Sequence, residues 1–160
     1  MAIGLTVPDT PVVLDNDIFT HWRNGQPYVL HEIAEYINRH KRPPALTTMT
    51  LFEAMYGIES SVAKGVISKE QAQEYQSKIE KLSQGCIILP FDQNAATTAA
   101  YIFARLSQSE RNKHWRDLFT AATALAHRHG VATQNKKDFE LIATHLPSNN
   151  PLLRLAIWKA

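Results

Sequence analysis

The chain has 160 residues, of which 44% are hydrophobic, and this is enough for one domain with its own hydrophobic core. Its 17 Lys and Arg residues barely outnumber its 15 Asp and Glu residues, which excludes the strong basic bias of a histone-like nucleic-acid binder. Its single cysteine excludes an internal disulfide and cannot by itself build a zinc site.

The N-terminal segment MAIGLTVPDT lacks the basic start and the apolar core of a signal peptide, and no apolar run is long enough to span a bilayer. We therefore expect a single cytoplasmic domain over residues 1–160, without a membrane partner, in which residues 1–10 form an N-terminal extension.

The first predicted element in the chain is a short buried strand, PVVLD (11–15), and the helical segment after it is expected to end at Asn24-Gly25. Apolar residues at helical spacing from Tyr28 onward predict an amphipathic helix, which Pro43-Pro44 ends. ALTTM (45–49) predicts a second strand, and another helix follows it.

The middle of the chain repeats this alternation. SKEQAQEYQSKIEKLSQG begins with the capping-box spacing of Ser68 and Gln71, which predicts a solvated outer helix. CIILP (86–90) predicts a third buried strand, and Asp92 opens the alanine-rich helix after it. The polar stretch SQSERNKHW (107–115) predicts a loop.

The last third of the chain begins with RDLFTAATALAHRHG, which predicts a helix that ends at Gly130. VAT (131–133) predicts a fourth strand, KKDFELI begins another helix, and residues 143–160 are expected to form an edge strand or a docked tail. Short apolar strands separated by helices predict an α/β domain, with a mostly parallel sheet between two layers of helices.

Acidic and amide side chains fall where such a sheet places ligands, beyond the carboxyl ends of its strands. Asp15 ends the first predicted strand, Glu53 follows the second, and Asn135 lies just past the fourth. Asp117 opens the helix that leads into the fourth strand, and because that helix runs antiparallel to the strand, its start lies at the same rim. The small residues Ala121 and Ala124 share a face with Asp117 and allow close packing on the sheet.

Carboxylates gathered in this way repel one another and raise one another's pKa values unless cations lie among them. Oxygen ligands without His or Cys select hard ions, Mg²⁺ or Mn²⁺. Structural roles compete with this interpretation: Thr50 and Glu53 fit a capping box, Asp117 can cap a helix, and Asn135 or Asp138 can start the next helix. Asp17 and Asp92 are better explained as helix caps.

Four segments in order carry a family resemblance: VVLDND, LTTMTLFEAMYGI, ILPFDQNAATTAAYIFARL and RDLFTAATALAHRHGVATQNKKDFELI. With them the chain resembles the PIN-domain ribonucleases and, within these, the VapC toxins of bacterial toxin–antitoxin pairs. The resemblance implies a PIN-like three-layer α/β/α fold. It also implies metal-dependent hydrolysis of RNA phosphodiester bonds, in which Mg²⁺ or Mn²⁺ activates water and stabilises charge on the phosphate.

Carried over by residue, the acidic metal site of the family falls on Asp15, Glu53 and Asp117, with Asn135 or Asp138 at the fourth position. Thr133 also matches the closing motif. The chain departs from the family at Asn16, where the family usually has Thr or Ser. Asn16, Thr133 and Asp138 are candidates for residues that support the metal ligands.

Basic residues flank the same rim and are candidates for phosphate contacts, although a solvated face explains them as well. They are Lys113, Arg116, Lys136 and Lys137. The resemblance also implies a homodimer and a small cognate antitoxin that covers the catalytic groove. Amphipathic segments at 17–40 and 50–64 could present that groove or simply pack the core.

Two other functions compete with the nuclease. VVLDNDIF also fits the nucleophile motif of haloacid-dehalogenase-type phosphatases, but the later Lys and the further acidic pair of that mechanism have no convincing match in this chain. The second alternative is a catalytically inactive RNA-binding or scaffold member of the PIN fold, which the departure at Asn16 keeps open.

Overall fold

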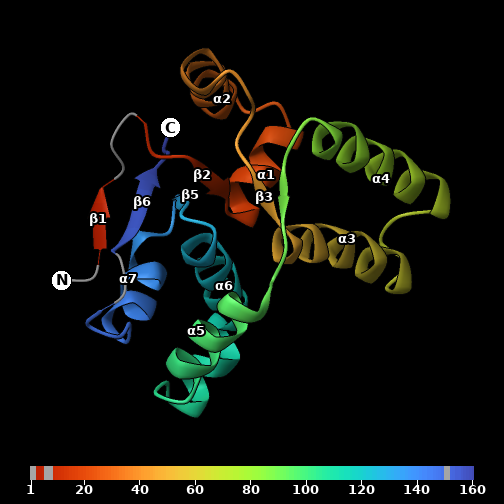
Figure 1. Cartoon of the computed structure of the whole chain (residues 1–160). Helices are drawn as coiled ribbons and strands as arrows, with labels where there is room; N and C mark the ends of the chain where they lie inside the picture. The colour runs from red at the N-terminus through yellow and green to blue at the C-terminus, as the bar shows by residue number, and fades with distance from the viewer. Residues whose placement is uncertain (1–2, 6–8, 150–151) are drawn as a thin grey trace.

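The structure is a computed structural model that describes residues 3–5, 9–149 and 152–160. Short strands form a sheet at its centre, and helices lie on both faces of that sheet (Figure 1). In chain order the strands are β1 (Ile3–Leu5), β2 (Val12–Leu14), β3 (Leu46–Thr47), β4 (Ile88–Leu89), β5 (Gly130–Thr133) and β6 (Leu153–Ile157).

The strands lie in the order β1-β6-β5-β2, and the pair β3-β4 continues the sheet beside β2. The connection is a parallel bridge between Val13 and Ala45, where the N–H of Leu14 donates to the Ala45 carbonyl across 3.0 Å. Every pairing between the described strands is parallel. The predicted parallel sheet is therefore confirmed, and the carboxyl ends of its strands share one rim.

The C-terminal segment differs from the expectation of an edge strand or a tail over residues 143–160. Residues 143–144 still belong to a helix, and β6 pairs with β5 on one side and with β1 on the other. Leu153 and Leu155 are buried in the core, so burial of these side chains favours an interior position. The edge position is held by β1, which comes from the predicted N-terminal extension.

The helices begin largely where the sequence predicts them. Ser68 and Gln71 form the predicted capping box, and Asp92 accepts a hydrogen bond from the Ala95 N–H at its own helix start. Among the described residues, no helix is both long and apolar enough to span a membrane. In chain order the helices are α1 (Asn16–Arg23), α2 (Pro27–His40), α3 (Thr48–Ala63), α4 (Lys69–Gln84), α5 (Gln93–Phe103), α6 (Gln108–Ala126) and α7 (Lys136–Thr144).

Two apolar cores lie on opposite faces of the sheet, which gives the expected three layers. Val13 and Val131 point into a core shared with α5, α6 and α7. Leu14 and Ala132, one position further along the same strands, point into a core shared with α1, α2, α3 and α4. This alternation follows from the strand period of two residues. Figure 1 shows the two groups of helices on either side of the sheet.

Both ends of α6 differ from the prediction. The stretch expected to be a loop is helical from Gln108 onward, because Ser107 and Glu110 form a second capping box that starts the helix early. The helix ends at Ala126 rather than at Gly130, since Arg128 takes the left-handed conformation with a φ of 59°. Asp117 therefore lies within α6 and does not cap it.

Candidate metal centre

Asp15 is held rigidly at the carboxyl end of β2. Its backbone N–H donates to the Ala132 carbonyl of β5 across 2.9 Å, and its side chain accepts from the Asn16 N–H across 2.8 Å and from the Thr133 hydroxyl across 2.9 Å. The residue is only 5% exposed. Burial raises the pKa of Asp15 to about 6, although these two side-chain hydrogen bonds oppose the shift and nearby Asp17 and Asp138 add to it.

Thr133 connects two parts of the site. Its hydroxyl donates to Asp15 and accepts from the Asn135 N–H across 2.9 Å, and the residue is fully buried. A hydroxyl can serve both bonds because it carries one donor and two lone pairs. Thr133 thereby fixes the orientation of the Asp15 carboxylate and the path of the chain that leads into α7.

Glu53 lies in the second turn of α3, so the capping box with Thr50 that we considered is not formed. The helix is capped by Thr47, whose hydroxyl accepts from the Thr50 N–H. The Thr50 hydroxyl instead donates to the Leu14 carbonyl across 3.0 Å and ties α3 to the end of β2. Burial raises the pKa of Glu53 to about 7; the charge of Asp15 adds to the shift, and the guanidinium of Arg116 opposes it.

Asp117 has the largest shift of the three predicted acids. Burial raises the pKa of Asp117 to about 8, and the charges of Asp15, Asp138 and Glu53 contribute in that order. Ala121 and Ala124 are fully buried, as the small-residue face of this helix predicts. They allow α6 to approach the sheet, so the Asp117 carboxylate lies among the acids of the rim even though it does not start the helix.

Asn135 and Asp138, the two residues predicted for the fourth position of the metal site, lie next to each other. Asn135 precedes α7, but its side chain makes no capping bond; its amide instead donates to a carboxylate oxygen of Asp138. Asp138 in turn contributes to the raised pKa values of Asp15 and Asp117. Asp138 therefore belongs to the acidic cluster, and Asn135 orients it.

His114 also faces this cluster, and the sequence interpretation missed it. Its Nδ1 lies 3.8 Å from Asp117 Oδ2 and 3.7 Å from Asp138 Oδ1. The signal in the sequence is the three-residue spacing between His114 and Asp117, which puts both on one helix face. That signal was lost because residues 107–115 were expected to form a loop.

The donor set fits a divalent cation. Four carboxylates share the rim, and three of them carry pKa values raised to between about 6 and about 8. A bound cation offsets the repulsion and the loss of solvation that cause these shifts. Among the described residues, His114, Asp117 and Asp138 offer ligand atoms that all lie within 4.8 Å of one another.

A family model identifies the fold that carries this cluster. The model of the PIN domain matches residues 12–144. The chain belongs to the PIN domain family. The match spans β2 to α7 and includes every acid of the cluster. The phosphatase alternative is accordingly not retained.

Solved structures have the same fold as this PIN domain. A chain in the DNA-bound VapBC complex of Salmonella typhimurium matches with a TM-score of 0.68 and 20% identity, over 94% of this chain and 99% of that chain. VapBC-1 from nontypeable Haemophilus influenzae gives a TM-score of 0.64, 21% identity and coverages of 92% and 97%. VapBC2 from Rickettsia felis, bound to a promoter DNA fragment, gives a TM-score of 0.64 and 20% identity, over 92% of this chain and 98% of that chain. A comparison with curated proteins gives no match.

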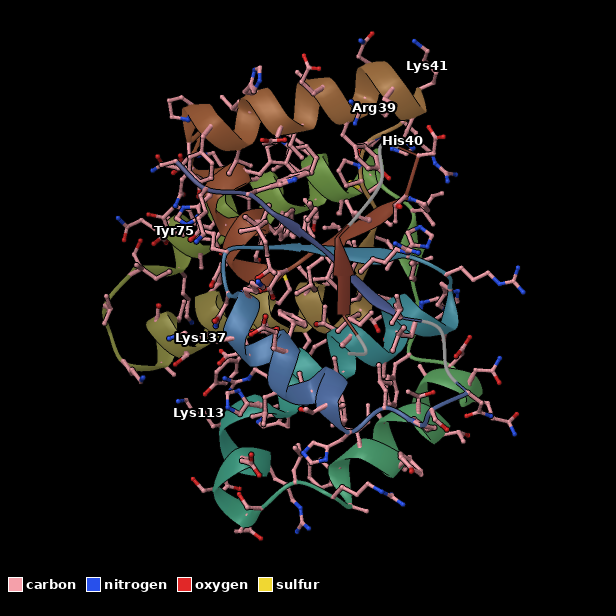
Figure 2. All side chains as sticks on the ribbon, turned by 90° about the vertical axis from the view of Figure 1, so that its left-hand side faces the viewer. Arg39, His40, Lys41, Tyr75, Lys113 and Lys137 are labelled. Carbon is pink, nitrogen blue, oxygen red and sulfur yellow. The ribbon has the colours of Figure 1, made fainter. Side chains whose placement is uncertain are left out.

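The four basic residues predicted beside the rim of this PIN domain have different surroundings. Lys113 and Lys137 are exposed and lie on the same side of the molecule (Figure 2). The Arg116 guanidinium lies 4.9 Å from the centre of the Trp115 ring and interacts with Glu53. Lys136 pairs with Glu140 across 3.3 Å, which makes it the least available of the four.

A second basic group lies away from the rim. Arg39, His40 and Lys41 end α2, and Figure 2 shows them on the opposite side of the molecule from Lys113 and Lys137. This placement follows from topology, because a helix that precedes a parallel strand ends at the amino edge of the sheet. The two groups are therefore separated by the sheet.

A groove of about 220 Å³ leads from the cluster between α1, α3 and α4. Asn16 and Glu53 lie at the end of the groove near the acids, and Arg23 also lines it. The side-chain oxygen of Asn16 and Nε of Arg23 are buried without a hydrogen-bond partner among the described residues. The other residues that line the groove are Thr20, Ala54, Gly57, Ile58, Ser61, Ile67 and Tyr75.

Proposed function

We propose that this PIN domain is a metal-dependent endoribonuclease that hydrolyses RNA phosphodiester bonds and is the toxin of a VapBC-type toxin–antitoxin pair. The observation that carries the proposal is the cluster of buried Asp15 with half-buried Glu53, Asp117 and Asp138 at the rim of a PIN fold. Asp15 caps α1 and Asp138 lies in the first turn of α7, but neither Glu53 nor Asp117 caps a helix, so capping does not explain why four acids gather at one rim.

In this proposal Asp15 and Asp117 are direct ligands of Mg²⁺ or Mn²⁺, and Glu53 binds directly or through water. The bound ion would activate a water molecule and stabilise the charge that develops on the phosphate. Thr133 fixes the Asp15 carboxylate, while Asn135 orients Asp138. The chain therefore supplies a preset arrangement of negative charge, which is what a hard cation requires.

The RNA backbone would approach past Lys113, Arg116 and Lys137. Exposed Lys and Arg side chains bind phosphates without sequence preference and confer salt-dependent affinity. The net charge of the chain is only +2, so these positions must supply the local attraction. We assign no phosphate contact to Lys136, because its ammonium is paired with Glu140.

The groove between α1, α3 and α4 is the proposed binding site for the antitoxin. Glu53, an acid of the cluster, and Asn16, which follows Asp15, both line this groove, so a segment bound there would reach the catalytic cluster. Chains with this fold occur in VapBC complexes, which is consistent with an antitoxin partner for this chain.

A separate apolar surface supports the proposed homodimer. A depression of about 260 Å³ lies between α5, α6 and the loop after β4. Phe91, Phe103 and Phe119 line it together with alanines of α5, and Phe91 and Phe103 are each more than one third exposed. Exposed aromatic side chains that surround an apolar depression are typical of protein interfaces.

Incubation of purified, antitoxin-free protein with a panel of structured RNAs tests the proposed function. Cleavage is expected with Mg²⁺ or Mn²⁺ and is expected to stop with EDTA. Binding of RNA without cleavage under every metal condition would instead favour a catalytically inactive RNA-binding or scaffold protein.

A further inference from the structure

His114 has a buried nitrogen that its surroundings do not satisfy. The residue is 5% exposed, and its Nδ1 has no hydrogen-bond partner among the described residues. The nearest acceptors are Asp138 Oδ1 at 3.7 Å and Asp117 Oδ2 at 3.8 Å. Both distances exceed those of a hydrogen bond between nitrogen and oxygen, which are rarely longer than about 3.2 Å.

Leaving a polar atom buried and unpaired destabilises the folded protein. Proteins rarely carry this cost without a reason, and a bound ion is one of the few that explain it. His127 provides a contrast within the same chain: its Nε2 also faces a carboxylate, Asp92, across 3.3 Å, but the same nitrogen contacts the Pro90 carbonyl at 3.1 Å. Among the histidines that the structure describes, only His114 directs an unpartnered nitrogen at two carboxylates of the site.

We infer that His114 is a metal ligand, and that its Nδ1 forms a three-residue metal position with Asp117 and Asp138. Two atoms that each bind one ion at about 2.1 Å lie at most about 4.2 Å apart. The separations of 3.7 and 3.8 Å from His114 Nδ1 to the carboxylate oxygens meet this limit, and the ligand atoms of the three residues all lie within 4.8 Å of one another. They are too long for hydrogen bonds and short enough for ligands of one ion.

The nitrogen ligand changes which ion this position prefers. Mg²⁺ takes oxygen ligands almost exclusively, whereas imidazole nitrogen suits transition-metal ions. Mn²⁺ accepts carboxylate oxygen and imidazole nitrogen together, so the donor set of two carboxylates and one imidazole favours Mn²⁺ over Mg²⁺. This inference deepens the proposed function, because Asp117 would belong to both the catalytic cluster and the Mn²⁺ position.

Pulsed electron paramagnetic resonance of the full chain loaded with one equivalent of Mn²⁺ tests the inference. A directly bound imidazole gives a ¹⁴N coupling on the Mn²⁺ signal, and protein labelled with ¹⁵N-histidine must convert it into a ¹⁵N coupling. We expect this coupling in the unmodified protein. A Mn²⁺ signal without any histidine nitrogen coupling would overturn the inference without the need for a variant.

Variants then assign the nitrogen. His114→Gln should abolish the coupling and weaken Mn²⁺ binding by about tenfold or more in calorimetry, with a much smaller effect on Mg²⁺ binding. His127→Gln is the matched control, because His127 also faces a carboxylate, and it should leave the coupling intact. Loss of the coupling in His127→Gln and its retention in His114→Gln would overturn the assignment.

The outcome is separable from that of the proposed function. A histidine coupling that depends on His114, in a protein that cleaves no RNA with any metal, would leave the Mn²⁺ position standing and reject the nuclease. Metal-dependent RNA cleavage without the histidine coupling would support the nuclease and reject His114 as a metal ligand.

Discussion

The hydroxyl of Thr133 donates a hydrogen bond of 2.9 Å to the Asp15 carboxylate, across a sequence separation of 118 residues. The bond joins the ends of β2 and β5, the two adjacent strands that define the acidic rim. Thr133 is fully buried and also accepts from the Asn135 N–H. One side chain thus positions a proposed metal ligand and the start of α7.

Thr133→Val should weaken metal binding and RNA cleavage without unfolding the protein. Valine keeps the shape and the β-branch but removes both hydrogen bonds, and the loss of such a supporting group typically costs about 10–100-fold in metal affinity or activity. Calorimetric titration with Mn²⁺ measures the first effect, and initial rates of cleavage measure the second.

Thr120→Val is the matched control for this substitution. Thr120 is also fully buried, but its hydroxyl has no hydrogen-bond partner among the described residues. Its replacement should leave metal affinity unchanged and leave stability unchanged or slightly higher. Equal losses of metal affinity in both variants would show that Thr133 acts through general packing.

The stability of the metal-free protein should fall as the pH rises from about 4 to about 8. The pKa of Asp117 is raised from 3.8 to about 8 and that of Glu53 from 4.5 to about 7, chiefly by burial. A carboxyl whose pKa is higher in the folded state binds its proton more tightly there, and this stabilises the folded protein. The stabilisation is complete at a pH below the unfolded-state pKa and is lost as the pH rises through the folded-state pKa. Urea unfolding in EDTA at several pH values measures the effect.

Asp117→Asn isolates the part of this decline that belongs to Asp117. The variant should be more stable than the unmodified protein at pH 8, on the order of 1 kcal/mol, and the difference should shrink toward pH 4. Saturating Mn²⁺ should reverse the order at pH 8, because the ion stabilises only a site with its ligands intact. A difference that does not change with pH would contradict the proposed cause.

Lys113→Gln combined with Lys137→Gln should weaken RNA binding and reduce its dependence on salt. Each lost phosphate contact lowers the slope of log affinity against log salt by about 0.7 for a single strand. Filter binding of an uncleavable RNA in EDTA at several salt concentrations measures the slope. Arg39→Gln combined with Lys41→Gln removes the same charge on the opposite side of the molecule (Figure 2) and should have a much smaller effect.

Ala100→Glu should convert the proposed homodimer into a monomer. Ala100 is an exposed residue that lines the apolar depression on α5, so a carboxylate there would lose its water at the interface without disturbing the core. Light scattering during size-exclusion chromatography measures the mass. Asn94 lies on α5 outside that depression, so Asn94→Glu should keep the dimer. If the unmodified protein is itself a monomer, the assignment of this surface is contradicted.

The sequence was sufficient for the elements whose signals are local. The capping box of Ser68 and Gln71 and the cap at Asp92 rest on neighbouring residues, and the structure contains both. The strand predicted at 11–15 is present as the shorter Val12–Leu14. The rim of acids could also be predicted, because parallel strands place their carboxyl ends together. Asp15, Glu53 and Asp117 interact electrostatically as that argument requires.

The remaining features depend on tertiary packing. Nothing local distinguishes β6 from an edge strand, because its interior position depends on pairing with β1 from the other end of the chain. His114 was missed because the polar composition of residues 107–115 outweighed the capping box of Ser107 and Glu110. An early start to α6 puts His114 on the face of Asp117, and only that geometry brings its nitrogen to the acids.

The central claim is metal-dependent hydrolysis at the Asp15 cluster, and one comparison tests it most directly. Asp15→Asn and Asp92→Asn are each incubated with a structured RNA panel in Mn²⁺, Mg²⁺ or EDTA. Asp92 caps α5, a task that Asn performs equally well, so this control should cleave like the unmodified protein. Metal-dependent cleavage by the control and none by Asp15→Asn is the predicted result, whereas equal cleavage by both variants would contradict the account.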